Sequence, residues 1–290
     1  MSKTNMRHAY LIIAHNEFEV LQHLLNALDD KRNDVFIHID KKVKTHPNLH
    51  MREGRLSILK NTLEVYWGHI SQIEAEYLLF ETAHKNGSYA YYHLISGVHL
   101  PLYNQSYLHA FFDRLKGKDL LMKMDIPVEE VTIKVRKYNF FIKSYFSSQG
   151  STRKISQFLW RASIRFQKIF DIIANKKETF YKASNWLSLS QKSMDYVLKE
   201  KSKVLKKYRY SFCGDEFFVP SILENMSLKS NVVYYDKLLK CDFEGGNTKT
   251  YSLANYDDII NSGCLFARKF SVQNINVVEK ILTNLNSRTE

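Results

Sequence analysis

The stretch HAYLIIAHNEFEVLQHLLNALDDKRNDVFIHID, residues 8–40, decides the fold. Its first part, residues 8–15, is a short apolar run, which predicts a strand that is buried on both faces. Residues 17–30 follow with apolar side chains at helical spacing. Residues 34–40 alternate and are rich in β-branched types, which predicts a second strand. A strand, a helix and a strand with short links predict a parallel unit, because parallel strands need a crossover.

The same alternation continues along the chain. We expect further strands at 63–67, 89–97 and 119–125, with helices over 71–87 and within 100–117. Strand and helix alternate in this way over about 120 residues, which predicts an α/β fold with a mostly parallel sheet flanked by helices on both faces. Ligands of such sheets bind at the carboxyl ends of strands. The turns to consider first therefore follow Ile13, Ile39, Val65 and Ile95.

The composition limits the classes of function and partner to consider. The net charge is +12, from 42 basic and 30 acidic residues, and favours a polyanionic partner: nucleic acid, an anionic membrane surface or a phosphate-bearing substrate. The three cysteines include no CxxC pair, which indicates reduced thiols. We see neither an apolar stretch long enough to span a membrane nor a signal peptide, so we expect a cytoplasmic protein.

An acidic pair stands directly before an apolar run in SFCGDEFFVPSIL, residues 211–223. One interpretation makes Asp215 the N-cap of the following helix, where a carboxylate is stabilised by free N–H groups. Another concerns Glu216, which Phe217 and Phe218 would partly desolvate, as suits a general base. Both interpretations stay open at this point.

Three further places have a functional and a plain interpretation. In FARKF, residues 266–270, Arg268 and Lys269 suit a diphosphate, or form a solvated basic pair. Asp40 ends a predicted strand and suits ribose hydroxyls or a base edge, or is an ordinary turn residue. Trp67 could stack on a ligand or fill the core.

Several motifs are absent from the sequence. It contains no Asp-x-Asp pair and no HExxH pattern, so no metal is implied. It contains neither GxxxxGK[ST] nor GxGxxG, the two nucleotide fingerprints, and no GxSxG elbow.

Seven segments, taken in order, resemble one family. They are HAYLIIAHNEFEVLQHLLNAL, VFIHIDKK, VYWGHISQIEAEYLLFETA, YYHLISGVHLPL, SNWLSLSQKSMDYVL, GDEFFVPSILEN and LFARKF, and they span residues 8–270. The family is that of the core-2/I-branching β-1,6-N-acetylglucosaminyltransferases and their relatives the peptide O-xylosyltransferases, glycosyltransferase family 14. The resemblance implies a GT-A-like (Rossmann-like) α/β fold in a bacterial-type member. It also implies inverting transfer from a UDP-sugar, with GlcNAc or xylose as the sugar and with no cofactor and no divalent metal.

The resemblance assigns roles position by position. Glu216 matches the catalytic base, and Arg268 with Lys269 matches the basic pair that binds the diphosphate in place of a metal. Asp40 matches the carboxylate at the uridine. The other positions near the donor are Ile13, Val65, Tyr66, Trp67, Asn185, Trp186 and Asn247.

The sequence departs from the family in places that concern the donor sugar and the acceptor. His99 stands where relatives carry an acidic residue, and Asp242–Phe243 where they often carry Asp-Trp. Asn247–Thr248 replaces His-Pro or Ser-Pro. We expect one catalytic domain, 1–290, with a nucleotide-binding half, a basic and aromatic insertion, and an acceptor and catalytic half, at 1–125, 126–180 and 181–290.

The expected partners are a UDP-sugar and a glycan or lipid-linked glycan, as in the synthesis of a bacterial surface polysaccharide or glycoconjugate, with no nucleic acid. A nucleic-acid-binding protein and a catalytically inactive sugar-binding relative are the alternatives. Residues 152–177 form a predicted amphipathic helix with an apolar face and with Arg161, Arg165 and Lys168 on the other face. It would either pack on the core or lie on an anionic membrane, at the inner face of the cell membrane.

Overall fold

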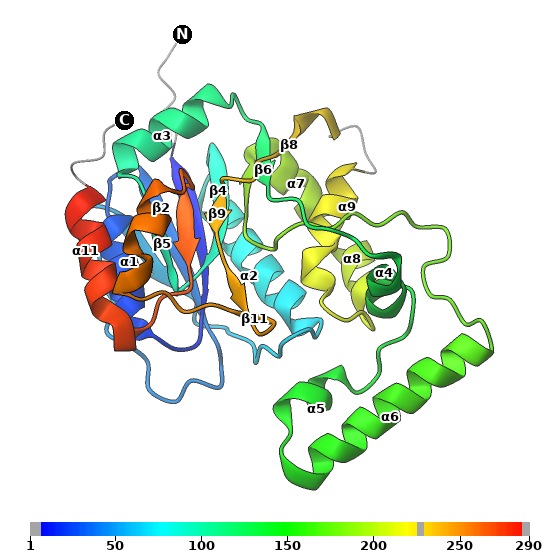
Figure 1. The fold of residues 1–290 in the computed structure, drawn as a ribbon. Helices are drawn as coiled ribbons and strands as arrows, with labels where there is room; N and C mark the ends of the chain where they lie inside the picture. The colour runs from blue at the N-terminus through cyan, green and yellow to red at the C-terminus, as the bar shows by residue number, and fades with distance from the viewer. Residues whose placement is uncertain (1–6, 225–228, 286–290) are drawn as a thin grey trace.

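The computed structural model describes residues 7–224 and 229–285. Its centre is a seven-stranded sheet with the order β3-β2-β1-β4-β7-β6-β8 (Figure 1). The strands are β1 (His8–Ala14), β2 (Asn33–Ile39), β3 (Arg55–Ile58), β4 (Tyr91–Ser96), β6 (Asp119–Leu121), β7 (Leu187–Ser190) and β8 (Val232–Tyr234). Only the two pairings of β7, with β4 and β6, are antiparallel. The predicted α/β class with a mostly parallel sheet is confirmed.

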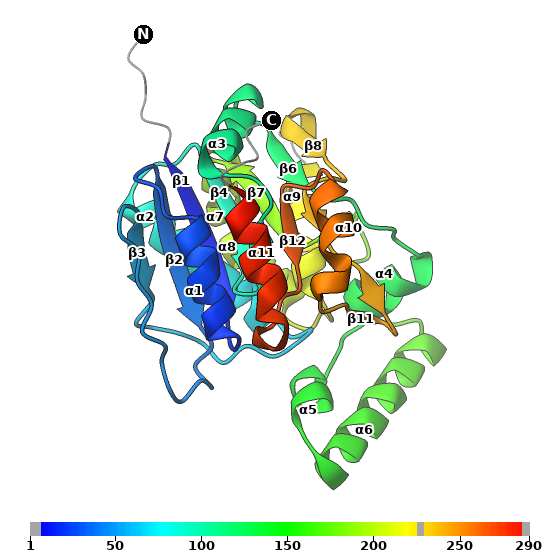
Figure 2. The same cartoon turned by 60° about the vertical axis from the view of Figure 1, so that its left-hand side comes forward.

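Helices cover both faces of this sheet (Figures 1 and 2). One apolar core receives α1 (Phe18–Ala27), α3 (Gln105–Arg114), α10 (Tyr256–Asn261) and α11 (Ile275–Leu285), and the other receives α2 (Ser71–Asn86), α7 (Gln191–Lys199), α8 (Lys201–Tyr208) and α9 (Phe218–Glu224). Along β1, Tyr10 and Ile12 enter the first core, whereas Ala9 and Leu11 enter the second. Because successive side chains of a strand point to opposite faces, a strand between two cores is apolar along most of its length.

The strand expected at 63–67 is wrong. The third strand of the parallel half is β3, which pairs with β2 at the sheet edge and is partly exposed. The backbone of residues 63–65 instead bonds to side chains at the end of β2. Leu63 N–H donates to His38 Nε2, and Val65 N–H donates to Asp40 Oδ2. The apolar pattern of 63–67 therefore reflects packing of a loop at the strand end, and not a place in the sheet.

Two smaller sheets complete the fold. β5 (His99–Pro101), β12 (Phe266–Arg268) and β9 (Leu239–Lys240) form a three-stranded sheet in which Arg268 lies opposite His99. β10 (Phe243–Glu244) and β11 (Asn247–Thr248) form a hairpin.

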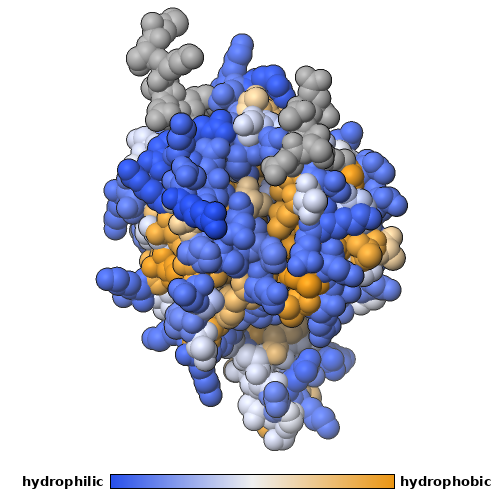
Figure 3. Space-filling view, turned by 90° about the vertical axis from the view of Figure 1, so that its left-hand side faces the viewer, coloured by the Kyte–Doolittle hydropathy of each residue, from blue (hydrophilic) through white to orange (hydrophobic). Residues whose placement is uncertain are grey.

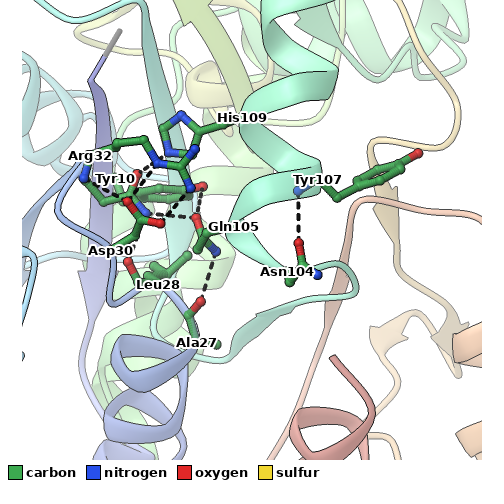
Figure 4. Close-up of polar contacts among 10 residues, drawn as sticks. Tyr10, Ala27, Leu28, Asp30, Arg32, Asn104, Gln105, Tyr107 and His109 are labelled. Atoms are coloured by element: carbon green, nitrogen blue, oxygen red, sulfur yellow. Dashed lines mark hydrogen bonds and ion pairs between the residues drawn. The ribbon is translucent and has the colours of Figure 1, made fainter. Parts of the chain in front are cut away.

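A polar network joins α3 to the turn that leads into the amino end of β2 (Figure 4). The side chain of Gln105, on α3, accepts from Asn33 Nδ2 at 2.8 Å and donates to the carbonyl of Ala27 at 2.9 Å. Asp30 and Arg32 form an ion pair at 2.6 Å beside it. Buried polar groups are stable only when they are paired, and here they lock α3 onto the α1–β2 turn.

Residues 126–180 contain α4 (Val128–Val135), α5 (Ile142–Ser147) and α6 (Gly150–Ile169). The predicted helix over 152–177 is shorter than expected, because α6 ends at Ile169. Its apolar stripe is exposed, so the interpretation of a core-facing helix is wrong. Among the described helices, none is both long and apolar enough to cross a membrane.

Candidate functional site

A cavity of about 680 Å³ opens at the carboxyl ends of β1, β2 and β4, where Ile13, Asp40 and Ser96 line it. The opposite wall comes from the second half of the chain. Of the predicted site residues, the cavity brings together Ile13, Asp40, Val65, Trp67, Asn185, Trp186, Glu216, Asn247, Arg268 and Lys269. Tyr66 is not among its lining residues: the Tyr66 ring lies against Lys42 Nζ at 4.3 Å and its hydroxyl donates to Glu64.

Glu216 ends a short 3₁₀ turn, Gly214–Glu216, directly before α9. Its carboxylate Oε2 receives a hydrogen bond from Lys134 Nζ at 2.8 Å, and Lys182 Nζ lies 3.7 Å away. Both lysines also reach Glu130 Oε1, at 2.7 Å and 2.6 Å. Two lysines and two glutamates thus form a partly buried, charge-balanced network at the cavity.

This network replaces the apolar surroundings expected for Glu216. Phe217 and Phe218 are fully buried in the core, whereas 23% of the Glu216 side chain is exposed. Burial alone would lower the pKa of Lys134, but Cys213, Glu216 and Glu130 raise that pKa above its usual value. Lys134 is therefore charged near neutral pH and forms an ion pair with the Glu216 carboxylate.

Asp215 has a different environment from its neighbour. It is not a helix N-cap as the first interpretation had it, because it lies inside the 3₁₀ turn and is buried. Gln72 Nε2 donates to Asp215 Oδ2 at 3.0 Å. Burial, followed by the charge of Glu216, raises the pKa of Asp215 to about 7. Glu76 lies behind it on α2, and burial, followed by Asp215, raises the Glu76 pKa well above its usual value.

Arg268 ends β12 and faces the cavity beside Trp186. Its guanidinium carbon lies 5.0 Å from the centre of the Trp186 ring, and Trp186 in turn packs edge-on against buried His99. Burial lowers the pKa of Arg268 below its usual value. Within residues 7–224 and 229–285, neither Arg268 nor Lys269 forms an ion pair, and Arg268 Nε is buried with no hydrogen-bond partner. A half-desolvated cation with unused donors is a site for an anion.

Asp40 organises the other end of the cavity. Its carboxylate accepts from the backbone N–H of Lys42 at 2.8 Å and of Val65 at 3.3 Å, and pairs with Lys42 Nζ at 3.3 Å. These contacts hold the 63–67 loop at the carboxyl end of β2.

Gly68 lets this loop approach the segment that carries the acidic pair. It has φ +70°, and a Cβ there would lie 2.4 Å from the Phe212 ring. The Gly68 carbonyl accepts from Cys213 N–H at 2.9 Å. Trp67 stays 57% exposed at the rim of the cavity, so the expectation that it fills the core does not hold.

Sequence reasoning missed Lys134, Lys182, Gln72 and Glu76. Only the spacing of Glu130 and Lys134, four residues apart on a helix, hints at one of these contacts. No group of three or more His, Cys, Asp or Glu side chains suited to a metal ion occurs in the described part of the chain.

Comparison with known proteins gives one family and several structures. A family model described as Core-2/I-Branching enzyme matches residues 8–257. No curated protein sequence matches this chain.

Matches among solved structures include S. aureus TarS, at 16% identity over 41% of this chain and with a TM-score of 0.27. The chain spans 22% of the length of that protein. A structure of TarS 1–349 matches at 12% identity over 98% of this chain and 73% of its own length, with a TM-score of 0.39. Mouse xyloside xylosyltransferase 1 in its apo form matches at 6% identity over 90% of this chain and 96% of its own, with a TM-score of 0.38.

Proposed function

Because the chain belongs to the Core-2/I-Branching enzyme family of glycosyltransferases, we propose that it moves a sugar, GlcNAc or xylose, from a UDP-sugar to a glycan hydroxyl with inversion and without a divalent metal. One observation carries the proposal: Glu216 and the Arg268–Lys269 pair line the same cavity at the carboxyl ends of the parallel strands. A base and a diphosphate-binding pair must share a cavity if both are to act on one donor.

The donor would lie along the wall from Asp40 to Trp186. Arg268 and Lys269 take the diphosphate, since they lie in the cavity and form no ion pair within the described residues. Their charge stabilises the UDP leaving group as negative charge grows on it, which is the task a metal performs elsewhere. Asp40 would contact the uridine and Trp186 the sugar next to the diphosphate, a proposal supported by the position of both residues in the cavity lining.

Transfer proceeds by a single displacement. The acceptor oxygen forms a bond to the anomeric carbon from the face opposite the diphosphate, while the bond from that carbon to the phosphate oxygen breaks and UDP leaves with the electron pair. Glu216 takes the proton of the acceptor hydroxyl, a contribution of about 10²–10⁴-fold. Lys134 and Lys182 both contact Oε2, so the other oxygen, Oε1, is the one we assign to the proton.

The acceptor is a glycan or a lipid-linked glycan of a bacterial surface polysaccharide or glycoconjugate. A thermal-shift screen with UDP-GlcNAc, UDP-xylose, UDP-glucose and UDP-galactose tests the donor class, because a ligand that binds only the native state raises the melting temperature. We expect at least one of the four to raise it. The shift should vanish in the double variant Arg268→Met/Lys269→Met and persist in Lys85→Met, which removes an exposed lysine at the end of α2. No shift with any of the four would contradict a UDP-sugar donor.

A further inference from the structure

Helices α5 and α6 form an arm, residues 142–169, that projects from the body of the protein (Figures 1 and 2). The two helices pack chiefly on each other, and the inner side of α6 holds the buried residues Ser156, Ile164 and Gln167. Gln167 anchors the arm, because its side-chain amide exchanges two hydrogen bonds with the backbone of Tyr138, at 2.7 Å and 2.9 Å.

The outer side of α6 is an apolar stripe that faces solvent. Phe158 is 70% exposed, Ile169 69% and Phe170 63%. The other members of the stripe, at the same helical spacing, are Ile155, Leu159 and Phe166. By comparison, the face that carries α1 and α11 is predominantly hydrophilic with scattered apolar patches (Figure 3). A contiguous apolar stripe of this size marks a surface that meets another apolar phase.

Cations flank the stripe. Arg161, Arg165 and Lys168 are exposed, as are Arg153 and Lys154 at the start of the helix. The helix α6 contains no aspartate or glutamate, and none of its cations has an ion pair within the described residues. The partner of the stripe should therefore be apolar and negatively charged at the same time.

A pocket of about 350 Å³ that is lined by lysines lies at the root of the arm. It is lined by no acidic residue and contains Lys137, Lys203, Lys206 and Lys207 together with Tyr138 and Tyr210, although Lys203 and Lys207 form ion pairs with Glu200 and Glu178. Lys137 Nζ donates to the carbonyl of Gln167 at 3.1 Å, so the pocket adjoins the end of α6. The two tyrosines are 38% and 39% exposed, and such half-buried aromatics with a polar tip suit a membrane interface.

We propose that the arm docks the protein on an anionic lipid membrane. The apolar stripe of α6 enters the boundary between headgroups and acyl chains, with the helix lying flat, and its cations and the lysine-lined pocket meet the anionic headgroups. A second copy of the chain is a poorer occupant. Pairing two stripes would bring two sets of unpaired cations together, and like charges repel.

The arm also touches the rim of the cavity. Phe146, on α5, packs edge-on against Trp67 with ring centres 4.5 Å apart, and Trp67 lines the cavity. Docking would therefore place the cavity near the membrane surface, where a lipid-linked acceptor would be presented; this consequence, unlike the docking itself, rests on the proposed function.

Flotation of the full chain with vesicles tests the docking without using catalysis. We expect the protein to float with vesicles of phosphatidylcholine mixed with phosphatidylglycerol, and much less with phosphatidylcholine alone. Added salt should weaken the binding, because it screens the attraction to anionic headgroups. The variant Phe158→Ser/Ile169→Ser should lower the partition coefficient about tenfold or more, since two large apolar side chains no longer insert.

Two further variants separate the electrostatic contribution to membrane binding from the apolar one. Arg161→Glu/Arg165→Glu should remove the preference for the anionic lipid, whereas Val128→Ser, an equally exposed apolar position outside the arm, should bind as the wild type does. Circular dichroism of each variant checks that it is folded. Failure of the folded wild type to float with anionic vesicles would overturn the proposal. So would a dimer in light scattering that Phe158→Ser/Ile169→Ser dissociates, since a second copy would then be the occupant.

Discussion

Lys134 Nζ lies 2.8 Å from Glu216 Oε2, although 82 residues separate the two in the sequence. Burial would lower the pKa of Lys134, but Cys213, Glu216 and Glu130 raise that pKa above its usual value, so the ammonium is charged near neutral pH. The contact therefore holds the carboxylate that is proposed to accept the proton of the acceptor hydroxyl.

Removal of that contact should slow the reaction. In Lys134→Met the hydrogen bond that holds Glu216 Oε2 is lost, so kcat should fall about tenfold or more while UDP affinity stays nearly unchanged. Steady-state kinetics of Lys134→Met and of Lys85→Met, the control, measure the effect. A wild-type kcat in folded Lys134→Met would show that the pairing does not position the base.

Arg268 and Lys269 should each contribute to UDP affinity. A hydrogen bond to a charged group contributes about 1.5–3 kcal/mol, so Arg268→Met or Lys269→Met should weaken UDP binding about ten- to a hundredfold. Calorimetric titration with UDP measures this. Wild-type affinity in both variants would place the diphosphate elsewhere.

The buried Asp215 should make stability depend on pH. Burial, and then Glu216, raise the pKa of this carboxyl to about 7, whereas an unfolded aspartate titrates near about 3.9. Between these values the native state binds the extra proton, so this contribution to the free energy of unfolding is complete below the unfolded pKa. It is lost as pH rises through about 7, by at most about 1.4 kcal/mol per pH unit for one proton.

Asp215→Asn cannot ionise and should flatten this dependence. Urea unfolding at several pH values measures it, with Asp125→Asn, at an exposed position, as the control. If the variant loses stability between about pH 4 and about pH 7 as steeply as the wild type does, Asp215 is not the titrating group.

The reaction should not need a divalent metal. We expect turnover to be unchanged after dialysis against EDTA, because the basic pair takes the charge of the leaving group. Comparison of the EDTA-treated enzyme with and without added Mn²⁺ checks this. A strict requirement for Mn²⁺ would contradict the role given to Arg268 and Lys269.

Much of this architecture could be predicted from the sequence, and the reasons are local. Strand β1 is apolar at nearly every position and β2 carries the apolar run Val35–Ile37 because two cores enclose them, and the ends of such strands locate Ile13 and Asp40 at the cavity. The edge strand β3 could not be predicted in this way. It is half exposed, so it lacks the apolar signal that the neighbouring loop, 63–67, happens to carry.

The surroundings of Glu216 lie beyond local patterns. Lys134 comes from α4 and Lys182 from the segment before β7, and only the folded chain brings them to the same carboxylate. The sequence also could not predict that the apolar stripe of α6 is exposed, because the same periodicity is typical of a helix on a core and of a helix on a membrane.

The central claim is that Glu216 is the base of a sugar transfer from UDP. It is tested most directly by the rate of UDP release from the UDP-sugar that binds, measured with the wild type, Glu216→Gln and the exposed control Glu129→Gln, with UDP affinity determined in parallel. The account predicts that Glu216→Gln loses about 10²–10⁴-fold in rate with nearly unchanged UDP affinity, and that the control keeps both. Near-wild-type release of UDP by folded Glu216→Gln would contradict it.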